Sequence, residues 1–157
     1  MTLSNLSLVD RADCPQKKVY IVENQMVFSH MCAELQSEGV ALMCTSGQIK
    51  TASVMVIDLL CEAGCEIFYA GDFDPEGVTI ADRIIRRNPR LIRPWRMSAE
   101  DYYLAISNER IDETRMLKLV NVQDMRLFEI CDAIREQKRA GYQEQLVAAM
   151  LEDIKSG

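Results

Sequence analysis

The stretch EIFYAGDFDPEG, residues 66–77, decides the fold class of this chain. It opens with an apolar run of β-prone residues and closes with two aspartates, a proline, a glutamate and a glycine. An apolar run without strict alternation is typical of a strand that is covered on both faces. Pro75 and Gly77 favour a tight turn into a following helix. The stretch therefore predicts a buried strand with an acidic end, followed by a helix.

Two earlier runs have the same apolar character, VYIVEN at residues 19–24 and ALMCTS at residues 41–46. Segments in which apolar residues recur at helical spacing separate the three runs. Gly39 and Gly64 stand where helices commonly end. Because strands and helices alternate, the sequence predicts a parallel sheet with right-handed crossovers.

A third helix is expected after Gly77 and before Pro89, and a fourth strand over residues 91–96. Helical spacing then continues through the last third of the chain. We therefore predict an α/β, Rossmann-like fold with about four parallel strands, helices on both faces and a helical C-terminal third. Residues 1–17 are expected to form a flexible arm, and residues 18–157 a single domain.

The composition narrows the class of protein. A chain of 157 residues with 48% hydrophobic and 27% charged residues suits one ordinary globular domain. No apolar segment approaches the roughly 20 residues of a membrane span, and the N-terminus lacks the pattern of a secretory signal. We therefore expect a cytoplasmic protein without a membrane partner. The net charge of −6 argues against a domain that binds DNA by bulk electrostatics alone.

Acidic side chains follow two of the predicted strands. Glu23 ends the first strand, and Asp72, Asp74 and Glu76 follow the third. The carboxyl ends of parallel strands meet at one edge of a sheet, where ligands bind, and alternation predicts Asp72 and Asp74 on the same side. Carboxylates gathered there suit Mg²⁺, which prefers oxygen ligands. The residues alone leave open a second interpretation, a solvated acidic turn that caps the following helix.

The order of these motifs resembles the Toprim domain of topoisomerases, primases and certain nucleases. More closely, the chain resembles the Toprim-type C-terminal domain of the nuclease subunit in bacterial Wadjet plasmid-defence systems and their uncharacterised relatives. The resemblance spans residues 19–154 and rests on four segments: CTSGQ at 44–48, YAGDFDPEGVTIADRI at 69–84, RPWRMSAEDY at 93–102 and GYQEQL at 141–146.

The resemblance implies a Toprim fold and a metal-dependent nuclease. Asp72 and Asp74 match the aspartates that hold Mg²⁺, or Mn²⁺ in its place, and Glu23 matches the glutamate that acts as general acid/base or as a metal ligand. Glu76 matches a position that is not always acidic in relatives and is a further candidate ligand. Relatives usually carry N-terminal DNA-binding domains, so DNA and other subunits or domains of a larger assembly are the expected partners, and the oligomeric state stays open. The tyrosines of the chain do not match the topoisomerase nucleophile.

Basic and polar side chains near the acidic edge are candidate DNA contacts. Six arginines lie within residues 83–96, and the fourth strand is expected to bring Arg93 and Arg96 back towards the acids. Ser46 and Gln48 of the TSGQ turn are candidate hydrogen-bond donors to phosphate. Two functions are therefore expected from the sequence: a Mg²⁺-dependent nuclease domain acting on DNA, or a Toprim-like binding or assembly module without chemistry of its own.

Overall fold

The structure is a computed structural model that describes residue 14 and residues 16–36, 38–46 and 51–156. The arm expected over residues 1–17 falls mostly, and Gln48 entirely, outside these residues. No helix in the described part of the chain is long and apolar enough to cross a membrane.

A four-stranded parallel sheet forms the centre of the fold, in the order β2-β1-β3-β4. Its strands are β1 (Lys18–Val22), β2 (Ala41–Cys44), β3 (Glu66–Ala70) and β4 (Ile92–Pro94). The predicted parallel sheet is thereby confirmed. The two central strands, β1 and β3, are its most buried, as expected for apolar runs without alternation.

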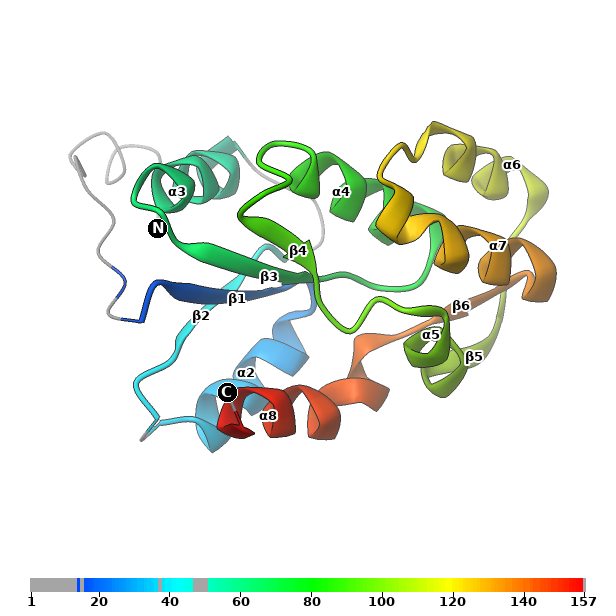
Figure 1. Cartoon of the computed structure of the whole chain (residues 1–157). Helices are drawn as coiled ribbons and strands as arrows, with labels where there is room; N and C mark the ends of the chain where they lie inside the picture. The colour runs from blue at the N-terminus through cyan, green and yellow to red at the C-terminus, as the bar shows by residue number, and fades with distance from the viewer. Residues whose placement is uncertain (1–13, 15, 37, 47–50, 157) are drawn as a thin grey trace.

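Helices cover both faces of the sheet (Figure 1), so the predicted α/β, Rossmann-like architecture is confirmed. In that view α3 (Thr51–Glu62) and α4 (Pro75–Ile85) lie above the sheet, whereas α2 (Gln25–Glu34) and α8 (Val147–Ser156) lie below it. Gly64 follows α3 with a positive φ of 75°, as a C-terminal glycine should. Gly39 also has a positive φ, of 63°, but lies in the loop beyond the end of α2.

The chain changes direction across the sheet between β1 and β3. From β1 it runs through α2 to β2 on one side, and it returns through α3 to β3 on the other side of β1. Val22 at the end of β1 pairs with Ala70 at the end of β3, so the two carboxyl ends lie side by side. In open α/β sheets such a switch point is where ligands bind.

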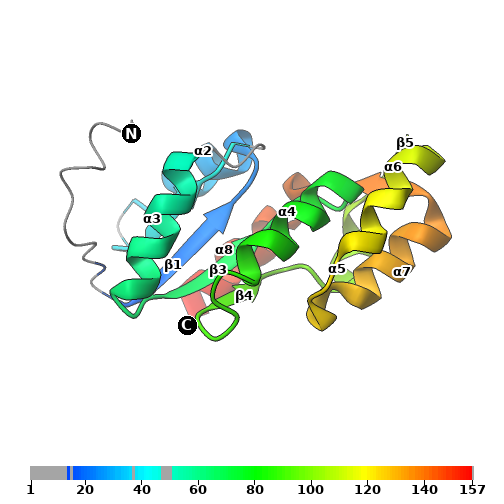
Figure 2. The same cartoon turned by 90° about the horizontal axis from the view of Figure 1, so that it is seen from above.

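Residues 99–141 lie beyond the carboxyl ends of the strands (Figures 1 and 2), and the last third of the chain is mostly helical, as predicted. A two-stranded antiparallel sheet of β5 and β6 interrupts the helices, because residues after the left-handed Lys138 turn back to pair with the chain that follows α5. The elements in order are α5 (Ala99–Ala105), β5 (Ile106–Arg110), α6 (Glu113–Met116), η1 (Leu117–Asn121), η2 (Met125–Leu127), α7 (Phe128–Gln137), β6 (Arg139–Gly141) and η3 (Gln143–Leu146).

Candidate active site

Two acidic side chains meet at the switch point. Glu23 directly follows β1, and Asp72 lies two residues beyond β3. The backbone N–H of Asp72 donates to Glu23 Oε2 at 3.2 Å. Between β3 and Asp72 stands Gly71, where a Cβ atom would lie 3.1 Å from the same oxygen. A glycine here therefore lets the end of β3 pass close to the Glu23 carboxylate.

Burial raises the pKa values of this pair. Glu23 is only 8% exposed, and burial together with the charge of Asp72 raises its pKa to about 7. Burial also raises the pKa of Asp72 to about 6, against the opposing effect of a hydrogen bond from the Gln143 backbone. Neither carboxylate forms an ion pair with any lysine, arginine or histidine that the structure describes. The negative charge at the switch point is thus uncompensated by side chains in the described structure.

A buried tyrosine stands beside the pair. Tyr69, near the end of β3, is fully buried, and both its burial and the charge of Glu23 raise the pKa of its hydroxyl. Neither this hydroxyl nor that of the neighbouring Thr45 has a hydrogen-bond partner of ordinary geometry among the described residues. Two buried O–H groups that interact with each other therefore lie next to the Glu23 and Asp72 carboxylates.

Residues 141–144 tie the two strand ends together. Gly141 and Phe73 exchange backbone hydrogen bonds. The backbone N–H of Gln143 then donates to Asp72 Oδ1 at 3.1 Å, and its side-chain Oε1 accepts from the Asn24 backbone at 3.2 Å. Gln143 is completely buried, and its Nε2 has no partner in the described structure. The sequence analysis did not identify Gln143 as a site residue. The one sequence feature that pointed to it was its position in the GYQEQL segment.

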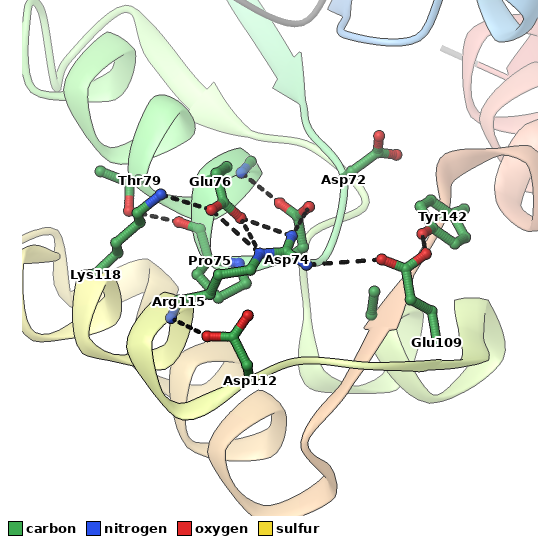
Figure 3. Close-up of polar contacts among 12 residues, drawn as sticks. Asp72, Asp74, Pro75, Glu76, Thr79, Glu109, Asp112, Arg115, Lys118 and Tyr142 are labelled. Carbon is green, nitrogen blue, oxygen red and sulfur yellow. Dashed lines mark hydrogen bonds and ion pairs between the residues drawn. The ribbon is translucent and has the colours of Figure 1, made fainter.

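Asp74 faces away from this pair, contrary to the alternation expected of an extended segment. Its Oδ1 accepts from the Gly77 N–H at 2.7 Å and so caps the N-terminus of α4. Its Oδ2 accepts from Arg115 at 2.9 Å. In Figure 3 its carboxylate and that of Asp72 point in different directions. The need to cap α4 and the ion pair with Arg115 override the simple two-residue period.

Glu76 is likewise held by cations. Arg115 contacts it at 2.8 Å and Lys118 at 2.7 Å. Although burial alone would raise the pKa of Glu76, these hydrogen bonds hold it at about 2. Arg115 also lies 3.6 Å from Glu109, whose carboxylate accepts from the Tyr142 hydroxyl (Figure 3). Sequence reasoning missed both cations, because they follow no motif and lie about forty residues along the chain from the acids they bind.

The structure separates the predicted DNA contacts. Arg96 donates to Asp153 of α8 and lies 3.5 Å from Asp101 of α5, so it links helices around the end of β4. Arg93 pairs at 3.0 Å with Glu66, the first residue of β3, and this contact lies at the opposite end of β3 from Asp72.

Ser46, in contrast, lies near the carboxyl edge as expected. It is exposed two residues after β2, with a positive φ of 53°. Gln48 lies outside the described residues, so the TSGQ turn is represented here by its first two members.

The four predicted metal ligands fall into two groups. Glu23 and Asp72 lie together, and no described cation pairs with either of them. Asp74 and Glu76, in contrast, form ion pairs with Arg115. In the part of the chain that the structure describes, no group of three His, Cys, Asp or Glu side chains is arranged to hold a metal ion. The Glu23–Asp72 pair nevertheless fits Mg²⁺, which is commonly held by one or two carboxylates together with water and substrate phosphate.

These features define a class of protein: an α/β domain with a parallel sheet and an acidic site at its switch point. A family model described as "Protein of unknown function C-terminus (DUF2399)" matches residues 1–154, and the chain belongs to this family. A search of curated proteins gave no match.

Proposed function

We propose that this domain performs Mg²⁺-dependent phosphodiester chemistry on DNA, as the nuclease domain of a larger plasmid-defence assembly. One observation carries the proposal: the buried Glu23 and the half-buried Asp72 lie together at the switch point, with no counter-ion among the described side chains. Buried carboxylates without a cation are costly, and a divalent cation would relieve that cost. The finer resemblance to the Toprim domain of the Wadjet nuclease subunit supports the choice of substrate.

Each side chain of the pair has a distinct part in the proposed chemistry. Mg²⁺ bound here, or Mn²⁺ in its place, supplies Lewis-acid stabilisation of charge on the phosphate. Asp72 is oriented for this by Gln143, which occupies Oδ1 and leaves Oδ2 for a ligand. In the metal-free chain, burial and the charge of Asp72 raise the pKa of Glu23 to about 7, which suits proton transfer near neutral pH. The same carboxylate is also a candidate metal ligand.

In this proposal, other parts of the assembly provide most of the affinity for DNA. The chain carries a net charge of −6, and two of the arginines first considered, Arg93 and Arg96, are engaged in ion pairs. Among the residues that the structure describes, Ser46 remains a candidate for a contact with a DNA phosphate at the acidic edge. Because affinity for DNA depends mainly on cations that neutralise phosphates, basic surfaces of partner domains or subunits have to supply it.

Calorimetric titration of the chain with Mg²⁺ and with Mn²⁺ tests the metal site. We expect binding that is lost in Asp72→Asn and weakened in Glu23→Gln. Asp132→Asn is the matched control, because Asp132 is an exposed acid on α7. If Asp72→Asn binds the divalent cation as tightly as the unsubstituted chain does, the assignment of the metal site to Asp72 is wrong.

Plasmid nicking by the complete assembly tests the activity. Cleavage should require the divalent cation and should fall by about 10² or more in Glu23→Gln, the usual contribution of a general acid/base. An assembly that cleaves equally well with Glu23→Gln contradicts the catalytic role.

A binding or assembly module without chemistry is the second candidate function. It is favoured by the absence, within the described residues, of any group of three His, Cys, Asp or Glu side chains that could hold a metal ion. This function predicts that Asp72→Asn leaves cleavage by the assembly intact while weakening association with its partners. The nicking assay and an association measurement on the same variant therefore separate the two functions.

A further inference from the structure

Arg115 brings a positive charge into the acidic site from outside the sheet. It lies in α6, and its guanidinium contacts acids at the start of α4 and an acid of β5. Its side chain is only 28% exposed. The three carboxylates that it contacts are those of Asp74 at 2.9 Å, Glu76 at 2.8 Å and Glu109 at 3.6 Å. Figure 3 shows the guanidinium at the centre of this group.

Both carboxylate oxygens of Asp74 are occupied by protein donors. Oδ1 accepts from the backbone of Gly77, and Oδ2 accepts from Arg115. A metal ion that used Asp74 would have to displace a guanidinium that Glu76 also holds through three hydrogen-bond contacts. Charge-assisted contacts of this kind are the strong ones, and two cations at one carboxylate repel each other.

The other acidic pair has the opposite character. Glu23 and Asp72 accept one backbone hydrogen bond each and form no ion pair with a described residue. One fully buried polar group beside them lacks a hydrogen-bond partner in the described structure, Nε2 of Gln143. Buried polar groups are nearly always satisfied by a partner or by ordered water, and the water shell of a bound cation offers such partners.

We infer that the site takes a single divalent cation, between Glu23 and Asp72, and that Arg115 fills the position of a second cation at Asp74. The inference rests on the proposed function, because it concerns the same metal site, and it specifies the number of metal ions. It also divides the acids: Asp72 is a ligand, whereas Asp74 orders α4 and anchors Arg115.

Calorimetric titration of the full chain with MnCl₂ alone counts the ions. We expect one equivalent for the unsubstituted chain. Asp74→Asn should keep that equivalent with an affinity within about threefold, while Asp72→Asn should lose at least about tenfold, as expected on removal of a direct ligand. Asparagine caps a helix as well as aspartate does, so Asp74→Asn preserves the start of α4.

Removing the guanidinium tests its role directly. Arg115→Gln should allow a second equivalent of Mn²⁺ to bind, because Asp74 and Glu109 lose their cation while Glu76 keeps only Lys118. Arg115→Lys keeps the positive charge and should remain at one equivalent. Electron paramagnetic resonance of the Mn²⁺-loaded variants provides a second readout, since only a two-ion site gives a spin-coupled signal.

The outcomes separate this inference from the function beneath it. Two equivalents in the unsubstituted chain, or an Asp74→Asn loss equal to that of Asp72→Asn, overturn the single-ion assignment and leave the proposed function standing. Arg115→Gln that stays at one equivalent overturns the role of Arg115. A chain that binds no Mn²⁺ at all overturns the proposed function and the inference together.

Discussion

The backbone amide of Asp72 donates a hydrogen bond to the carboxylate of Glu23, and this contact joins the ends of the two central strands. It holds two acids together, and neither of them has a counter-ion among the described side chains. The N–H lowers the pKa of Glu23 slightly, but burial and the charge of Asp72 raise it more, to about 7. The metal-free protein therefore keeps an unfavourable charge at its centre at neutral pH.

Glu23→Gln should stabilise the metal-free chain above pH 7. A carboxyl whose pKa is raised in the folded state, from 4.5 to about 7, makes stability fall as pH rises through that window. The substitution removes this loss, which amounts to about 3 kcal/mol at most. Urea unfolding at pH 5 and pH 8 with a chelator present measures it: we expect a gain at pH 8 and almost none at pH 5. An equal effect at both pH values contradicts the raised pKa.

Gly77→Ala should destabilise the fold more than Gly71→Ala. A Cβ at position 77 would lie 2.4 Å from the backbone oxygen of Asp72, which cannot move without shifting the loop. At position 71 the nearest atom, at 3.1 Å, is the flexible side-chain oxygen of Glu23. Overpacking typically costs about 1–3 kcal/mol, so we expect the upper end for Gly77→Ala and the lower end for Gly71→Ala. Thermal unfolding of both variants gives the ranking, and the reverse order counts against this loop geometry.

Gln143→Met should lower stability by about 1–3 kcal/mol, because it leaves the partly buried N–H of Asn24 without its acceptor while nearly preserving volume. The hydrogen bond from the backbone N–H of residue 143 to Asp72 persists. The affinity for Mn²⁺ should therefore fall less than the stability does. Gln145→Met is the matched control, since Gln145 is exposed in the same segment. Equal melting temperatures for the two variants show that the buried amide contributes nothing.

Arg96→Gln should destabilise the chain without altering metal binding. Arg96 and Trp95 both donate to Asp153, so the arginine connects the end of β4 to α8. Because the pair is partly exposed, we expect a loss of about 1 kcal/mol. Denaturant unfolding and Mn²⁺ titration of the same preparation check both halves. Weaker metal binding with unchanged stability would contradict the structural role of Arg96 and would support a role for it at the acidic site.

The sheet was predictable because its signals are local. Apolar runs, the acidic strand end and the terminal glycine after α3 each specify structure within a few residues, and all four strands lie within or beside the predicted runs. The meeting of Glu23 with Asp72 follows from parallel topology alone. The capping role of Asp74 agrees with the second interpretation of the acidic turn, whereas its ion pair with Arg115, 41 residues further along the chain, was not predictable in this way. The same holds for β6, whose three residues pair with distant partners rather than following a pattern of their own.

The bond between Asn24 and Gln143 joins residues that are 119 positions apart. During synthesis the four strands of the sheet are complete well before the ribosome reaches residues 141–144, and until then the two carboxyl ends lack the segment that fixes Asp72. The acidic site is therefore completed by contacts between residues near the two ends of the described chain. Truncation before residue 141 would remove the segment that fixes Asp72, although all four strands of the sheet would still be present.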